Sequence, residues 1–183
     1  MSRGTKMNRG LTSEDKLAAV NPKNMQLKID FLDYLKSIQR SPLTINGYSN
    51  DLDIFFCWVL DNADNKPFAS ITKRELVRFQ NWLCGDNQNS PSRVRRIKSA
   101  ISSLSNYITA ILDTEDEFKD FKSIVRNIEN PAFQPVREKT VLSDEQVDKL
   151  LSELVKTNKI EKACAVALAM FSGRRKAELS RTS

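Results

Sequence analysis

The sequence predicts a mainly α-helical fold, with a helical bundle, a linker and the opening helices of a second unit. From about Asn24 onward, apolar residues recur at steps of three and four, the spacing that buries one face of a helix. Serine or threonine residues stand where they can cap successive helices. The sequence has no clear period-two alternation and no hairpin dipeptide, so we do not expect strands in this part of the chain.

The first two predicted helices lie in the segments "MQLKIDFLDYLKSI" and "SPLTINGYSNDLDIFFCWVL". The second opens with Ser41, which can cap free backbone N–H groups, and Pro42, which is tolerated at the first helical position. The first helix has the apolar stripe Ile29, Leu32, Leu35 and Ile38, and the second has Ile45, Tyr48, Leu52, Phe55 and Val59.

The third and fourth helices also carry start signals. Thr72 and Glu75 form a capping-box pattern for a helix that Gly85 can end. A second serine–proline pair, Ser90 and Pro91, opens the fourth helix. The third helix has the stripe Leu76, Phe79 and Leu83, and the fourth has Val94, Ile97, Ile101, Leu104, Ile108 and Ile111. The opposite face of the fourth holds Arg95, Arg96, Ser99, Ser102, Ser103 and Asn106.

A fifth helix is expected from the capping-box pair Thr114 and Glu117. It would run through the apolar residues Phe118, Phe121, Ile124 and Val125. Prolines then interrupt the helical pattern, and we interpret Asn130–Thr140 as a linker.

Two helices of a second unit are predicted after the linker. Ser143 and Gln146 form a capping box for the first, and the second, roughly Glu161–Phe171, is apolar enough that we expect it to be buried. The arginine-rich turn "FSGRRKAELS" follows. The expected organisation is a flexible basic tail over residues 1–23, a bundle over 24–129, a linker over 130–140 and a second unit over 141–183.

Composition restricts the partners and the compartment. The net charge of +6 favours an acidic polymer as partner, although a slightly basic soluble surface would give the same value. The cysteines Cys57, Cys84 and Cys164 lack metal-ligand spacing, and Cys57 and Cys164 lie in apolar segments that predict buried thiols in a reducing compartment. The chain has no histidine, so we expect no zinc site, and no other cofactor is predicted. The longest apolar run has nine residues and a bilayer needs about 20, so we expect a cytoplasmic protein and no membrane partner. With DNA as the acidic partner, the protein would be nucleoid-associated.

Two helix faces are candidates for nucleic-acid contact. The helix after Pro91 carries four basic residues and no acidic residue in its first two turns, followed by hydroxyl side chains. Lysine and arginine attract phosphates, and hydroxyl groups hydrogen-bond phosphate oxygens at close range. The alternative is a solvated helix face, but basic charge at a helix start opposes the macrodipole. The residues concerned are Arg93, Arg95, Arg96, Lys98, Ser99 and Ser103, and on the helix after Ser41, with weaker support, Ser41, Thr44, Asn46, Ser49 and Asn50.

The arginine-rich turn is a third candidate. Arg175 and Glu178 are three residues apart, so on a helix they share a face. Helix N-termini and guanidinium groups both bind phosphate well. A surface ion pair of small energetic consequence is the alternative.

Taken together, these segments resemble the tyrosine recombinase (phage integrase) family, over roughly Met25–Leu179. "SGRRKAEL" is similar to the family's first catalytic box, with Arg175 at the catalytic arginine position and Glu178 at the acidic position; Arg174 stands where an apolar residue is more usual. "LSDEQVDKLL" is similar to the opening helix of the catalytic domain. The Ser41 and Ser90 segments resemble the second and fourth helices of the core-binding domain, with Arg96 and Ser99 at its basic and small positions.

The resemblance implies a SAM-like orthogonal helical bundle that binds duplex DNA, followed by the first helices of an α+β catalytic domain. Family members clamp DNA, cleave it through a 3′-phosphotyrosyl intermediate without metal or nucleotide, and assemble as tetramers on paired sites. Arginines stabilise the charge that develops on the phosphate.

The sequence departs from the family in lacking a His-x-x-Arg box and a C-terminal tyrosine. Its three tyrosines, Tyr34, Tyr48 and Tyr107, lie in the predicted bundle. We therefore expect the remaining catalytic elements to lie beyond residue 183, and this chain alone to be a monomer that binds DNA without cleaving it. Two alternatives are a DNA-binding regulator without the catalytic half and a helical protein-interaction module.

Overall fold

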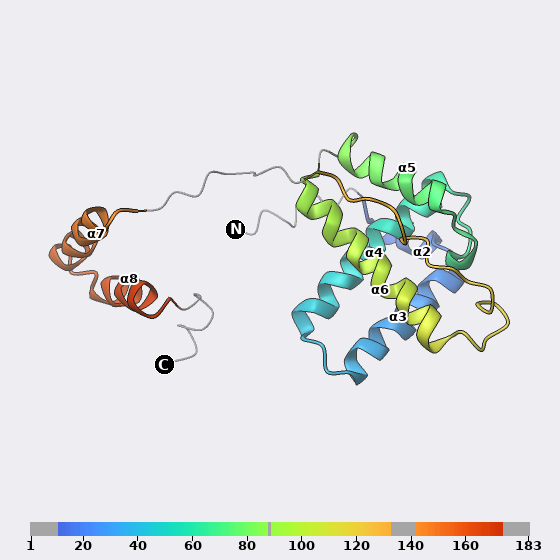
Figure 1. The fold of residues 1–183 in the computed structure, drawn as a ribbon, viewed down its shortest axis with the longest axis horizontal. Coiled ribbons are helices and arrows are strands. Elements are labelled where there is room, and N and C mark those ends of the chain that lie inside the picture. The colour runs from blue at the N-terminus through green and yellow to red at the C-terminus, as the bar shows by residue number, and fades with distance from the viewer. Residues whose placement is uncertain (1–10, 88, 133–141, 174–183) are drawn as a thin grey trace. The chain divides into compact units, whose positions relative to one another are not determined.

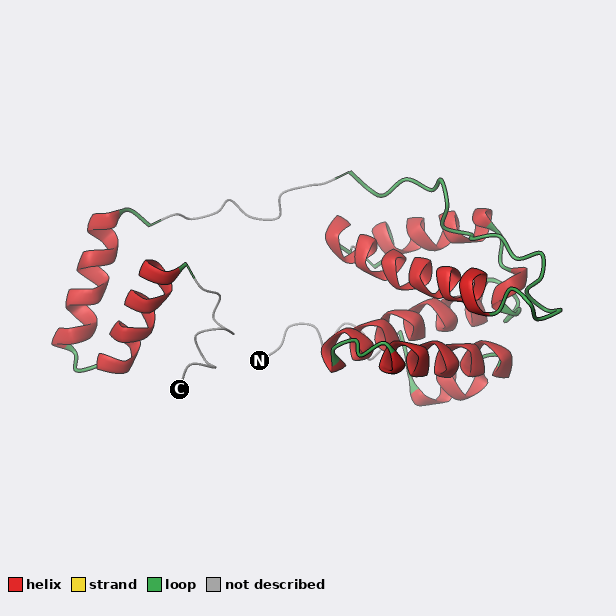
Figure 2. Cartoon of the chain, turned by 60° about the horizontal axis from the view of Figure 1, so that its bottom comes forward, coloured by secondary structure: helices red, strands yellow, loops and turns green. Residues whose placement is uncertain are grey.

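The computed structural model describes residues 11–87, 89–132 and 142–173. The chain divides into two compact units, Met1–Val136 and Arg137–Ser183, and each is described by itself. All regular elements in the described ranges are helices, which confirms the predicted mainly α fold, and Figure 2 shows these helices joined by loops. The predicted linker, 130–140, lies mostly outside the described residues.

The first unit contains five α-helices and one 3-10 helix in its described part (Figure 1). In chain order these are α2 (Glu14–Ala19), α3 (Pro22–Ser37), α4 (Pro42–Asn62), η1 (Phe68–Ser70), α5 (Lys73–Cys84) and α6 (Pro91–Ile111). The second unit contains α7 (Asp144–Lys156) and α8 (Ile160–Ser172).

The predicted caps are present at the helix starts. The side chains of Ser41 and Ser90 accept hydrogen bonds from the third residue of α4 and α6, and a proline follows each serine. Thr72 forms the predicted capping box with Glu75. Burial alone would raise the pKa of Glu75, but hydrogen bonds from Lys66 and Thr72 outweigh burial and hold that pKa below its usual value.

The core of the first unit forms around α4 and is rich in aromatic rings. The Phe55 ring is fully buried and lies 5.0 Å from the Phe79 ring of α5, edge to face. Phe68 of η1 packs edge-on against Phe55 at 6.1 Å. The apolar stripe of α6 closes the core with Val94, Ile97, Ile101, Leu104 and Ile108, all at most 1% exposed.

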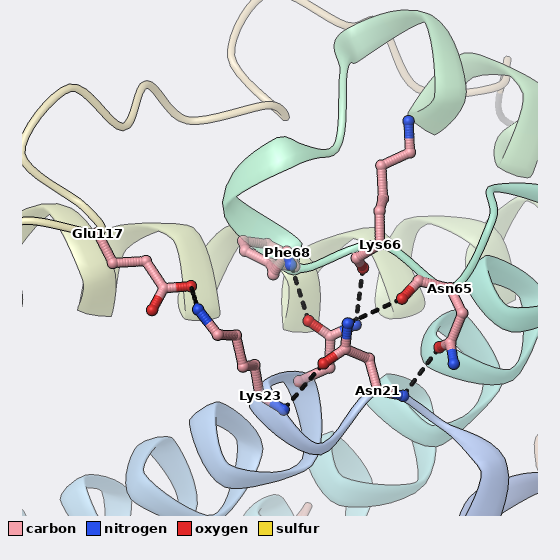
Figure 3. Close-up of polar contacts among 7 residues, drawn as sticks. Asn21, Lys23, Asn65, Lys66, Phe68 and Glu117 are labelled. Carbon is pink, nitrogen blue, oxygen red and sulfur yellow. Dashed lines mark hydrogen bonds and ion pairs between the residues drawn. The ribbon is translucent and has the colours of Figure 1, made fainter.

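A polar network fixes the loop after α4 to the start of α3 (Figure 3). The Asn21 backbone N–H donates to Asn65 Oδ1 at 2.8 Å, and Asn21 Nδ2 donates to the Asn65 carbonyl at 2.9 Å. Asn24 is buried; its Nδ2 donates to the Lys66 carbonyl, and its Oδ1 accepts from the Phe68 N–H at 2.7 Å. The network satisfies buried backbone groups that the loop cannot pair by itself.

Three expectations for the first unit were wrong: the extent of the N-terminal tail, the fifth helix and the apolar stripe of the first predicted helix. Part of the expected N-terminal tail is helix α2, which packs on α4 and is capped by Ser13. The segment expected to be a fifth helix, 114–125, contains turns and no helix, although Ile124 is buried. Its apolar residues Phe118, Phe121 and Ile124 recur every three residues, which successive i→i−3 turns can bury as well as a helix can.

The stripe predicted for α3 was also misplaced. Its buried face consists of Leu27, Phe31 and Leu35, whereas Ile29 and Ile38 are exposed. Ile29 lies two residues from Leu27 and from Phe31, about 200° around the helix, so it points away from the face that packs on α4.

In the second unit, α8 is not buried as we expected. Only Ala163 of this helix is buried, while Leu168, Met170 and Phe171 are exposed and Cys164 is an exposed thiol. In the described part of this unit only α7 packs against α8, so one helix covers only part of its apolar circumference. Cys57 of α4 is buried, as predicted.

Candidate nucleic-acid interface

Helices α4 and α6 pack against each other, and side chains from the first half of α6 reach α4 at Gly47 and Asp51. Both helices begin with a serine cap and a proline, and neither has an acidic residue in its first turn. Two helix starts therefore lie on the same unit with their partial positive charge uncompensated by local carboxylates.

A buried carboxylate joins the two helices. Asp51 of α4 has a side chain with 0% exposure. Arg93 Nη1 donates to Asp51 Oδ1 at 2.5 Å, and Arg96 Nε forms an ion pair with Asp51 Oδ2 at 3.2 Å. A buried carboxylate needs such partners because an unpaired charge would be very costly to desolvate. Two positive charges thus meet one negative charge.

Arg96 is the more exposed of the two arginines. Its side chain is 59% exposed, against 25% for Arg93, although its Nε is tied to Asp51. The guanidinium group lies over Gly47 of α4, where a Cβ atom would come within 2.7 Å of Arg96 Nη2. The missing side chain at Gly47 is what allows the guanidinium to lie against α4.

The hydroxyl groups predicted for the two helices are not all free. Ser41 Oγ and Thr44 Oγ1 are 2.8 Å apart at the start of α4. On α6, Ser99 is exposed and its Oγ donates to the Arg95 carbonyl at 3.0 Å, while Ser103 Oγ donates to the Tyr48 hydroxyl oxygen at 3.4 Å. Each hydroxyl oxygen keeps further hydrogen-bonding capacity. Ser49 is half-buried.

Two basic residues of α6 point elsewhere. Lys98 is buried, and its Nζ donates to the carbonyls of Ile128 and Glu129 and to Gln80 Oε1 of α5. Burial lowers the pKa of Lys98. Arg95 Nη2 donates to the Pro131 carbonyl at 3.0 Å. Lys98 lies about 200° around the helix from Arg96, so Lys98 and Arg96 lie on different sides of α6.

Two residues of this cluster were missed from the sequence. Gly47 and Asp51 are four residues apart on α4, so they share the face that meets α6. The only sequence signal was an acidic residue directly beside the apolar stripe. Arg175 and Glu178, the residues predicted for phosphate chemistry, lie outside the described residues.

Neither a metal site nor a membrane-spanning helix is present in the described part of the chain. Within 11–87, 89–132 and 142–173, no cluster of cysteine and acidic side chains could hold a metal ion. None of the helices in these ranges is long and apolar enough to cross a membrane.

Comparison with known proteins identifies the first unit. Residues 27–113 match the family model described as the phage integrase N-terminal SAM-like domain. This match and the relative described next support the tyrosine recombinase (phage integrase) family for this chain. It is also 26% identical over 137 residues to the SPbeta prophage-derived recombinase-like protein YomM of Bacillus subtilis (strain 168).

That alignment covers 74% of this chain and 41% of the relative, so the chain spans about two fifths of the length of the relative it matches. No solved structure matches the chain. The family domain contains α4 and α6 entirely, and with them the whole Asp51–Arg93–Arg96 cluster.

Proposed function

We propose that this member of a site-specific recombinase family binds duplex DNA through the N-terminal halves of α4 and α6. One observation carries the proposal: Arg96 is mostly exposed and lies on α6 one turn from the exposed Ser99, within the integrase-type domain. This combination suits the sugar–phosphate backbone, because guanidinium and hydroxyl groups are its usual partners.

The charge balance of the interface supports an anionic partner. Asp51 neutralises only one of its two arginines, so the cluster keeps a net positive charge at the surface. The chain as a whole carries +6. Each phosphate that a cation neutralises releases bound counterions, so binding through this face depends on salt concentration.

The catalytic part of the proposal concerns Arg175, which we assign to stabilisation of the phosphate during strand cleavage, with Glu178 in a supporting role. The tyrosines of the first unit are poor candidates for the nucleophile, because their rings pack against one another and the core. Tyr34 and Tyr107 lie 5.1 Å apart between ring centroids, and Tyr48 stacks on Phe31 at 6.2 Å. Burial raises the pKa of Tyr107, opposite to what an activated nucleophile needs. We therefore propose that this chain alone does not cleave DNA. We also propose that it binds DNA as a monomer.

Fluorescence anisotropy with a labelled duplex at several salt concentrations tests the DNA-binding face. Arg96→Ala and Ser99→Ala should each weaken binding, and Arg96→Ala should reduce the slope of log K against log salt by about one. Arg78→Ala removes the same charge from an exposed position of α5 and serves as the control. Affinity and slope that stay at the wild-type values for both variants would refute the assignment of this face.

The same titration separates DNA binding from the protein-interaction alternative. A helical protein-interaction module would not bind any duplex even at low salt. Arg175→Ala should leave the duplex affinity of this chain almost unchanged, because its proposed role begins at strand cleavage.

A further inference from the structure

We infer that Gly47 and Asp51 are positioning residues that hold Arg96 in the orientation needed to bind a DNA phosphate. This inference rests on the proposed function and assigns it a mechanism. Neither residue needs to touch DNA itself. Gly47 provides the space, Asp51 provides the ion-pair partner, and the terminal Nη groups of Arg96 make the contact with the phosphate.

The ion-pair partner is the carboxylate of Asp51. It meets Arg96 through Nε, at 3.2 Å from Oδ2, which leaves the terminal Nη groups to bind a ligand. The second oxygen of Asp51 is held by Arg93, so the carboxylate cannot rotate away without breaking that hydrogen bond. Because Asp51 is fully buried on α4, the position of its charge is fixed by the core.

The space is the absence of a side chain at Gly47. A Cβ atom there would come 2.7 Å from Nη2 and 3.7 Å from Cζ of Arg96, and the first distance is too short for non-bonded atoms. Since the obstructed atom is the end of a flexible side chain, Arg96 would move and the helix would not. Glycine inside a helix costs about 0.5–1 kcal/mol relative to alanine, so helix stability alone does not favour it at this position.

Preorganisation explains why such an arrangement helps binding. A free arginine loses rotamer freedom when it binds a phosphate, whereas an arginine already held at Nε loses less. Displacing Arg96 from Gly47 should therefore cost affinity even though no charge is removed.

The test is Gly47→Ala, alone and together with Arg96→Ala. The single variant should bind duplex about threefold to tenfold more weakly than wild type. Its thermal midpoint should be equal or higher, because alanine favours the helix. In the Arg96→Ala background, Gly47→Ala should have no further effect on affinity, because the residue through which it acts is gone.

Three outcomes would overturn the inference. Wild-type affinity in Gly47→Ala would show that the space over α4 does not matter. A further loss in the double variant would show that Gly47 acts by direct approach of DNA to the helix and not through Arg96. A lower thermal midpoint that accounts for the lost affinity would make the effect structural. Absence of duplex binding by the wild-type chain would instead overturn the proposed function, and this inference with it.

Discussion

A comparison of Lys98 with Arg96 distinguishes a cation that stabilises the fold from one that binds DNA. It lies two residues from Arg96 in a basic run, and from the sequence both were candidates for phosphate contact. In the structure Lys98 is 7% exposed, and Nζ donates at 2.6 and 2.8 Å to the carbonyls of Ile128 and Glu129 and at 3.2 Å to Gln80 Oε1. These bonds hold residues 128–129, which follow the turns of residues 114–125, against α5 and α6.

Replacing Lys98 with methionine keeps the apolar stem and removes the donor. An acceptor left without a donor costs about 1–3 kcal/mol when it is buried. The two carbonyls belong to partly exposed residues, so water can reach them, and removing a buried ammonium recovers some desolvation energy. We therefore expect Lys98→Met to lower the free energy of unfolding by about 2 kcal/mol. That corresponds to a thermal midpoint lower by about 5–8 °C for a unit of this size.

Circular dichroism melts and duplex titrations, performed on the same samples, make the comparison. Lys98→Met should lose stability while its affinity for duplex, measured well below its midpoint, stays near that of wild type. Arg96→Ala should show the opposite behaviour. Lys122→Met, which changes an exposed lysine within residues 114–125, is the matched control. An unchanged midpoint combined with a tenfold loss of affinity in Lys98→Met would refute the structural role.

Three further predictions concern the core and its ionisable groups. Iodoacetamide should alkylate the exposed Cys84 and Cys164 in the native chain and spare Cys57 until unfolding, as followed by peptide mass spectrometry; early labelling of Cys57 would contradict its burial. Burial, with the nearby Asp53 charge, raises the pKa of Cys57 from 9.0 to about 11. The unfolded chain therefore loses this proton at a lower pH than the folded chain, so the free energy of unfolding should fall by about 3 kcal/mol between pH 9 and 11. Urea titrations at each pH should show this fall in the wild type and not in Cys57→Ala. The lowered pKa of Glu75 gives stability that is present above its ordinary value of 4.5 and is lost as the pH falls through the folded value, so Glu75→Gln should flatten the acid limb of the same titrations. An acid limb as steep as that of wild type would show that other carboxylates cause it.

The helices and their starts could be predicted from the sequence because they depend on neighbouring residues. The serine–proline pairs before α4 and α6 and the capping boxes of α5 and α7 act within one turn, and the structure contains each of them. The stripe of α6 was also correct over most of its length, because long helices with a strict period have only one face to bury.

Predictions failed where burial depends on what packs against an element. The residues of α3 offered two apolar faces, and only the contact with α4 selects the one that contains Leu27 and Phe31. The apolar residues after Ile111 reach the core through turns, because spacing by three is compatible with either structure. The exposure of α8 depends on how much of its circumference another helix covers.

The amino-acid sequence by itself determined the helical class, the helix starts and the basic, hydroxyl-bearing character of α6. Only the tertiary structure decided which cations of α6 remain at the surface, because helices α4 and α5 pack on different sides of it. Asp51 and Gly47 hold Arg96 at the face shared with α4, while backbone carbonyls and Gln80 bind Lys98 inside. A one-dimensional pattern gives the charge of each residue, but the partners that fix a charge come from residues distant in the chain.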